Sequence, residues 1–189
     1  MNDSIQSDAE PFLFDDDLIN RILRILETLS QKNRIRYGLW VIERLRPNYV
    51  CLAAEMDWKI HATIERIHNA ISERIDDVEH DLNDICTLVE QLPEGDEGCS
   101  PYWPNGLDYL SALDQICAGM MQCEPLPFAR MFEICFNQID RDILNEVYGT
   151  CSGPHAPHDI ANMNSMVTNH PRMAHEFTTH EDFLKSLPN

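Results

Sequence analysis

Hydrophobic side chains recur along most of the chain at steps of three and four residues, which is the period of an amphipathic α-helix. The clearest rows are Leu18, Ile22, Ile25 and Leu29; Ile35, Leu39, Ile42 and Leu45; Ile60, Ile64, Ile67, Ile71 and Ile75; Val78, Leu82, Ile85, Val89 and Leu92; Leu107, Leu110, Leu113, Ile116 and Met120; Phe128, Phe132, Cys135, Ile139, Ile143 and Val147; and Met173, Phe177, His180, Leu184 and Leu187. No stretch alternates with a period of two, so no substantial sheet is predicted. The pattern predicts an all-α fold, a single bundle of about seven amphipathic helices.

Prolines and capping residues predict where these helices end or bend. Pro47 lacks a backbone N–H and its ring disfavours helical geometry at the preceding residue, so the second helix should be kinked or restarted there. Asp76 and Asp77 can cap a helix, which favours two helices over one long helix in residues 57–92. Residues 1–17 are predicted to be an acidic, mobile arm, and residues 18–189 a single all-α domain.

The charge balance narrows the classes of partner. The 189 residues include 32 Asp or Glu and 14 Lys or Arg, which gives a formal net charge of -18. Such a chain is repelled by the phosphates of nucleic acids and anionic lipids, so we expect no nucleic acid and no membrane as a partner. A hydrophobic content of 43 % is enough to build a core, which separates this chain from disordered acidic tails.

Cysteine usage and the N-terminal residues predict a cytoplasmic protein. The seven cysteines include no Cys-x-x-Cys pair, and an odd number is a poor disulfide framework, so we interpret them as reduced thiols. The first ten residues have neither the basic nor the apolar region of a secretory signal. Phosphate-binding glycine loops and the nucleophile-elbow motif are missing as well, so no cofactor and no catalytic residue are predicted.

The densest charge lies in residues 76–97, the acidic segment, which contains nine Asp or Glu and no Lys or Arg. Like charges on one helix face repel, so this arrangement gains no local stability. It is either a solvated surface that keeps the protein soluble or a docking surface for a basic protein. The predicted contact residues are Asp76, Asp77, Glu79, Asp81, Asp84, Glu94, Asp96 and Glu97, with Tyr102 and Trp103 as apolar anchors.

A group of histidines and acids predicts a different function, metal binding. Asp57, His61, Glu65 and His68 follow one another at steps of four, four and three, so they can line one helix face. Glu-x-x-His pairs hold the metals of carboxylate-bridged bundles, but a second such pair on another helix is missing. The four residues are therefore either an exposed polar stripe or the metal site of a helical enzyme. His180 is expected to pack in the core with one hydrogen bond.

Three segments resemble the YjaG-like bacterial proteins, a family of unassigned activity. Residues 43–49, Glu-Arg-Leu-Arg-Pro-Asn-Tyr, are similar to that family's Glu-Arg-Met-x-Pro-Asn-Tyr helix kink. Tyr102-Trp103-Pro104 with Asp108 resembles the opening of its middle helix, although Asn105 and Gly106 change the spacing. The third segment is Pro171, Glu176, His180, Leu184 and Leu187, where the family usually has Gln at the position of His180. The resemblance implies an all-helical, bacterial, cytoplasmic protein and supplies no catalytic residues.

Charge and fold class together predict a protein-binding module. Small acidic helical proteins include immunity proteins, whose carboxylates replace the phosphates that a basic nuclease toxin binds, so an immunity-like neutraliser of a basic toxin is the most concrete form of the prediction. The alternatives are a metal-dependent helical enzyme that uses the histidine face, and a housekeeping YjaG-like protein. The residue pattern does not specify an oligomeric state.

Overall fold

The computed structural model describes residues 16–56, 61–73, 103–148, 166–167 and 169–188. These residues form six helices and no strand, which confirms the all-α class. The helices are α1 (Asp16–Thr28), α2 (Gln31–Met56), α3 (His61–Glu73), α5 (Trp103–Gln122), α6 (Leu126–Tyr148) and α8 (Pro171–Ser186). Six of the seven predicted hydrophobic rows coincide with these helices. The remaining row, in residues 78–92, and most of the predicted arm lie outside the described residues.

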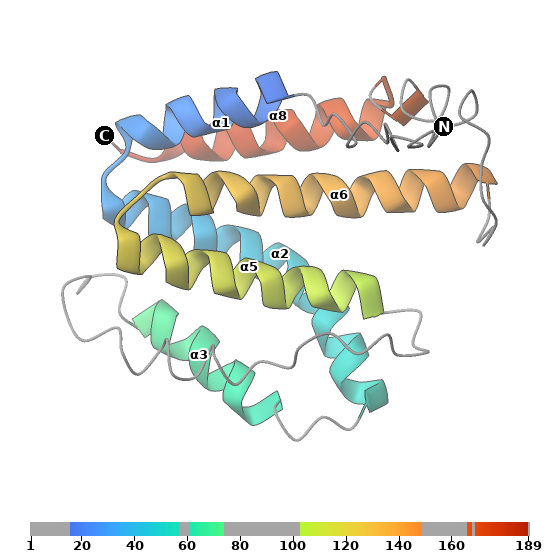
Figure 1. Ribbon diagram of the computed structural model, residues 1–189, viewed down its shortest axis with the longest axis horizontal. Coiled ribbons are helices and arrows are strands. Elements are labelled where there is room, and N and C mark those ends of the chain that lie inside the picture. The colour runs from blue at the N-terminus through green and yellow to red at the C-terminus, as the bar shows by residue number, and fades with distance from the viewer. Residues whose placement is uncertain (1–15, 57–60, 74–102, 149–165, 168, 189) are drawn as a thin grey trace, which may run out of the picture.

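The helices stack in layers (Figure 1). α1 and α8 lie side by side, and α6 packs against both of them. On the other side of α6 lie α2 and α5, which pack against each other. α3 contacts α2 and α5 and forms the outermost layer, on the side away from α1 and α8. α2 and α6 contact each other, and we call them the two central helices; polar side chains between them can be enclosed by α8.

One hydrophobic cluster runs through all six helices. The predicted row of α6 supplies four of its members, Phe128, Phe132, Cys135 and Ile143, and all four are at most 3 % exposed. α2 is buried around much of its circumference because helices pack on several of its sides. It brings Tyr37 and Tyr49 fully into the core. Since a buried tyrosine hydroxyl needs a hydrogen-bond partner, these two residues mark the polar clusters described below.

Pro47 lies inside α2, which continues through it to Met56. The helix changes direction in its C-terminal third (Figure 1), as expected where a proline removes one backbone hydrogen bond. The predicted kink is therefore present, and no restart occurs. The bend directs the last turns of α2 toward α3.

The cap at the start of α8 is His170, whose Nδ1 accepts a hydrogen bond from the backbone N–H of Arg172 at 3.3 Å. Pro171 occupies the first turn, where its missing N–H costs nothing. Among the described helices, none is long and apolar enough to cross a membrane.

Candidate functional site

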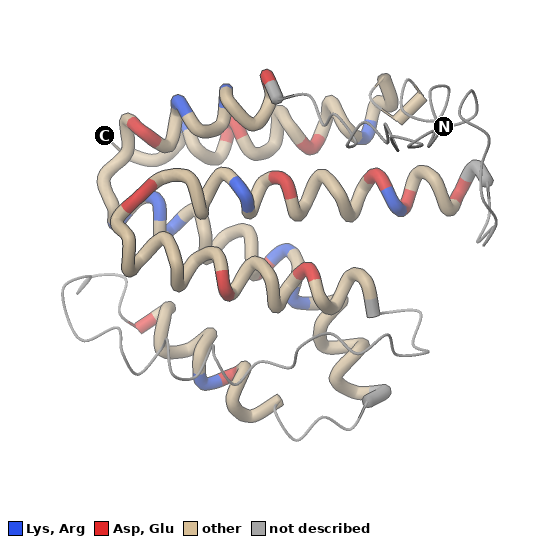
Figure 2. Tube along the Cα trace, viewed as in Figure 1, with Lys and Arg blue, Asp and Glu red and all other residues tan. Residues whose placement is uncertain are grey.

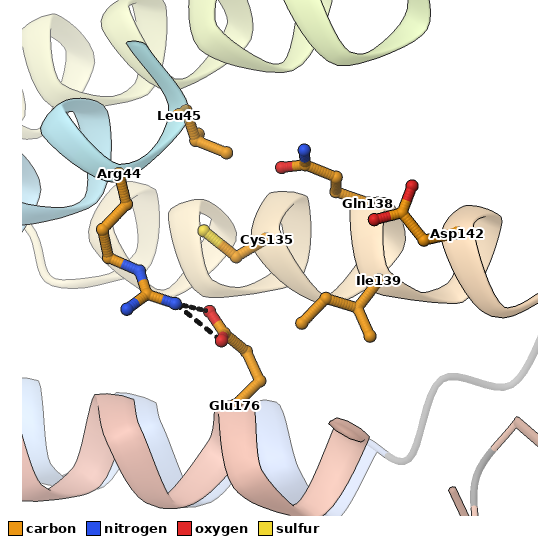
Figure 3. Close-up of a pocket in the computed structure, with 7 residues that line it drawn as sticks. All are labelled: Arg44, Leu45, Cys135, Gln138, Ile139, Asp142 and Glu176. Atoms are coloured by element: carbon orange, nitrogen blue, oxygen red, sulfur yellow. Dashed lines mark hydrogen bonds and ion pairs between the residues drawn. The ribbon is translucent and has the colours of Figure 1, made fainter. Parts of the chain in front are cut away.

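A pocket of about 160 Å³ opens between the two central helices and α8. Its lining residues are Arg44 and Leu45 of α2; Cys135, Gln138, Ile139 and Asp142 of α6; and Glu176 of α8 (Figure 3). Arg44 and Glu176 meet on one side of it, and Gln138 and Asp142 lie on the other side (Figure 3). We call this the central pocket.

Arg44 and Glu176 form an ion pair in the central pocket. Nη2 of Arg44 donates to both carboxylate oxygens of Glu176, at 2.7 and 2.6 Å (Figure 3). The guanidinium also lies over the ring of Trp40, 4.7 Å from its centroid. Glu176 is 5 % exposed, so its charge depends on this arginine for compensation.

His180 lies one turn after Glu176 on α8 and is fully buried, as predicted. Both of its ring nitrogens have partners, where the sequence predicted one hydrogen bond. Nδ1 lies 2.7 Å from the hydroxyl of Tyr37, and Nε2 lies 2.9 Å from Oε1 of Glu176. The imidazole packs edge-on against Trp40 and Phe132, which leaves its plane little freedom. α8 therefore presents a fixed carboxylate and a fixed imidazole to α6.

The protonation states follow from burial and from these partners. Burial alone would raise the pKa of Glu176, but the hydrogen bond from His180 and the charge of Arg44 outweigh it, so the pKa is lowered. Burial lowers the pKa of His180 against the opposing effect of Glu176. Burial also raises the pKa of the Cys135 thiol strongly, and the Glu176 charge adds to the effect. At neutral pH, Glu176 is therefore a carboxylate, His180 a neutral imidazole and Cys135 a thiol.

This state disfavours nucleophilic catalysis by Cys135. A cysteine attacks as the thiolate, and catalytic cysteines have a lowered pKa in a positively charged environment. The same three side chains are, however, a set of metal donors. The Cys135 sulfur, a Glu176 carboxylate oxygen and a His180 ring nitrogen lie within 4.8 Å of one another, and all three residues are buried. Within the described residues this is the group of side chains that could hold a metal ion.

The histidine face predicted from the sequence lies elsewhere, on α3. His61 Nδ1 lies 2.9 Å from the Tyr49 hydroxyl, and Arg46 donates to Oε2 of Glu65 at 2.6 Å. Asp57 lies outside the described residues, so the four-residue arrangement as a whole stays a prediction. The contacts of His61 and Glu65 hold α3 against the bent end of α2.

His68 completes this second polar cluster. It is 3 % exposed, and its Nε2 lies 2.7 Å from Oε1 of Glu43 while its Nδ1 lies 3.1 Å from the hydroxyl of Tyr109. The Tyr109 ring stacks on that of Tyr49 at 4.7 Å. Because both ring nitrogens of His68 are engaged by α2 and α5, the observed geometry favours a structural role for this histidine.

The predicted partner surface falls outside the described residues. Every acidic contact residue named above, from Asp76 to Glu97, and Tyr102 lie there. Trp103 is the first residue of α5, and its backbone alone is described. Because α3 ends at Glu73 and α5 begins at Trp103, helices that pack on α2 flank the acidic segment at both ends.

A third polar contact, between α5 and α6, makes stability depend on pH. Arg141 hydrogen bonds to Asp108, yet burial raises the pKa of Asp108 to about 6, against the lowering effect of Arg141 and with a small contribution from Asp142. Asp108 therefore binds a proton more tightly in the folded state than in the unfolded chain. Its protonation raises the free energy of unfolding as the pH falls through 6.

Asp108→Asn should remove that pH dependence. Between pH 7 and pH 5 the free energy of unfolding of the wild type should gain about 1 kcal/mol relative to the variant, measured by urea unfolding. Asp114→Asn, an exposed position on the same helix, is the matched control and should leave the pH profile unchanged. A parallel profile for wild type and Asp108→Asn would contradict the raised pKa.

The architecture is that of a layered all-α protein, and comparison with known proteins extends this description to a shared fold. No protein-family model and no curated protein matches the chain. Among solved structures, the fold is similar to that of a DUF416 family protein from Shewanella baltica, with a TM-score of 0.65 and 11 % sequence identity. The likeness covers 86 % of this chain and 82 % of that protein. At this identity the likeness concerns the fold, and the resemblance to YjaG-like proteins stays a prediction.

Proposed function

We propose that this chain is a binding module for a basic protein, with the acidic segment and its flanking aromatic residues as the contact. The observation that carries the proposal is how the charge is divided between the helical framework and the rest of the chain. The described residues contain 12 of the 14 Lys and Arg but only 17 of the 32 Asp and Glu. Most of the carboxylate surplus therefore lies outside the described residues.

The helical framework supports the proposal because its own charges are largely balanced. Figure 2 shows acidic and basic positions interspersed along the helices. Several are paired across helices, as in Arg172 with Asp142 and Glu146, and Arg21 with Glu181. Fifteen Asp or Glu and two Lys or Arg remain for the other segments, and nine of those acids fall in the acidic segment. A strong local negative potential steers a cationic partner and raises the association rate.

The partner class follows from the same chemistry. A run of carboxylates competes for arginine and lysine side chains that otherwise hold phosphates, so a nucleic-acid-binding or nucleic-acid-cleaving protein is the best fit. We infer an immunity-like role in which the chain covers the binding site of a basic toxin, such as a nuclease. Tyr102 and Trp103 would provide the apolar contacts that interfaces require beside charge.

The test is capture of the partner from cells of the source organism with the full-length chain. Asp77, Asp81 and Asp84 changed to Lys shift the charge by six units inside the acidic segment. The matched control changes the exposed Glu27, Glu124 and Asp182 to Lys and shifts the charge equally on the framework.

We expect the wild type and the control to capture the same basic protein and the segment variant to lose it. Equal capture by both variants would contradict the assignment of this surface. The protein encoded next to this chain is the first candidate partner, because immunity and toxin genes are expressed together.

A further inference from the structure

We propose that Cys135, Glu176 and His180 bind a zinc ion at the wall of the central pocket, with a water molecule from the pocket as the fourth ligand. Thiolate, imidazole and carboxylate are the three side-chain types that bind zinc, and three protein ligands with one open position are the arrangement of zinc sites that accept a small ligand. The donors come from α6 and α8, so this site differs from the predicted histidine face on α3.

The distances require little movement. In a tetrahedral zinc site, neighbouring donor atoms lie about 3.3–3.7 Å apart, given zinc bonds of about 2.0–2.3 Å. His180 Nε2 and Glu176 Oε1 are already 2.9 Å apart, and the Cys135 sulfur lies within 4.8 Å of a donor atom on each. A change in one side-chain rotamer, or a shift of about 1 Å, brings the sulfur into place. Both helices are packed into the core, so the donors stay together without metal.

The neighbours of the three donors match what surrounds zinc ligands in proteins. A metal-bound histidine usually donates its second ring N–H to an oxygen, which fixes the ring. The Tyr37 hydroxyl lies 2.7 Å from Nδ1 of His180, and because a hydroxyl can accept as well as donate, it supports the tautomer that frees Nε2 for metal. Arg44 contacts both oxygens of Glu176, so it can hold one oxygen while the other binds zinc.

The central pocket supplies access and the fourth ligand. Its volume of about 160 Å³ has room for several water molecules, and it reaches Cys135 and Glu176 directly (Figure 3). The polar atoms of Gln138 and Asp142 in its wall can hydrogen bond to such waters. The thiolate that forms when Cys135 loses its proton and the Glu176 carboxylate supply two negative charges to the zinc ion, and with Arg44 beside Glu176 the site as a whole carries one positive charge.

The test uses the full-length chain, purified without a His tag and stripped with a chelator. Zinc is titrated against a chromophoric chelator, and cobalt is used as a spectroscopic probe of the sulfur ligand. We expect one zinc per chain and a thiolate-to-cobalt charge-transfer band. Cys135→Ala should lose the band and the equimolar binding, whereas Cys117→Ala, a buried cysteine on α5, should keep both.

Two further variants separate a loss of zinc binding from a loss of folding. Cys135→Ser retains the size of the side chain and should also lose the band, with circular dichroism as the check of helicity. Tyr37→Phe removes the oxygen beside Nδ1 and should weaken zinc binding about 10-fold or more. Absence of the band in the folded wild type would overturn the proposal, and so would equal zinc affinity of wild type and Cys135→Ala. Neither result bears on the acidic segment, because the zinc site uses none of its residues.

Discussion

Arg44→Met is expected to lower the free energy of unfolding by about 3 kcal/mol. Methionine retains the aliphatic length of the arginine, but it leaves the Glu176 carboxylate, 5 % exposed, without its cation. Removing one partner of a buried pair costs more than the pair contributes, because the other charge stays buried. Arg44 is itself about one-third exposed, so we expect the lower end of the usual range. Urea unfolding followed by circular dichroism measures the change.

A double variant separates the unpaired charge from lost packing. Glu176→Gln removes the charge and keeps an oxygen for His180, so Arg44→Met combined with Glu176→Gln should be more stable than Arg44→Met alone. Arg130→Met, at an exposed position on α6, should change stability by less than about 0.5 kcal/mol. If the effects of Arg44→Met and Glu176→Gln on the free energy of unfolding simply add, the buried Glu176 charge does not need Arg44 for compensation, and the expectation is wrong.

Gly119→Ala is expected to destabilise the protein by about 2 kcal/mol, although alanine favours a helix by about 1 kcal/mol. A Cβ atom at position 119 would lie 2.4 Å from Cε2 and 2.7 Å from Cζ of the Phe128 ring. That ring is fully buried, and its other side faces Gly38, where a Cβ would lie 3.3 Å from Cε1. The ring cannot move away without disturbing α2, so the close approach of α5 and α6 depends on this glycine.

A smaller side chain at position 128 tests whether contact with the Phe128 ring causes the loss of stability in Gly119→Ala. Phe128→Leu should reduce the cost of Gly119→Ala, because the shorter side chain removes the ring atoms that the new methyl group would meet. Gly38→Ala should cost less than Gly119→Ala, since its closest neighbour is Cδ1 of Ile116, the end of a flexible side chain at 2.6 Å. A Gly119→Ala protein as stable as the wild type would show that the two helices can separate freely.

The helices could be predicted from the sequence because each buries a row of apolar residues at regular spacing. The hydrophobic row of α6 predicts the helix that is observed, Leu126–Tyr148. The bend at Pro47 follows from the chemistry of one residue. In contrast, the burial of α2 around much of its circumference depends on which helices surround it, and periodicity within one helix does not contain that information.

The sequence did not predict the central pocket, because its lining residues come from three helices that are far apart along the chain. Glu176 and His180 are four residues apart, which shows that they share a face, but nothing in the spacing brings Arg44 or Cys135 to them. The usable signal was a glutamate at a core-facing position of α8, one turn before a core histidine, since a buried carboxylate needs a cation. The contacts of His61 and Glu65 also required the three-dimensional structure, because their partners lie on α2.

The central claim is that the acidic segment was selected to meet a cationic protein, and one equilibrium measurement tests it most directly. The affinity of the captured partner is measured by calorimetry at about 0.15 M salt for two variants of equal net charge. One carries Lys at 77, 81 and 84, and the other at 27, 124 and 182. The account predicts a dissociation constant about 100-fold higher for the first variant, which corresponds to about 2.7 kcal/mol. Equal dissociation constants would contradict it, because net charge alone would then explain the binding.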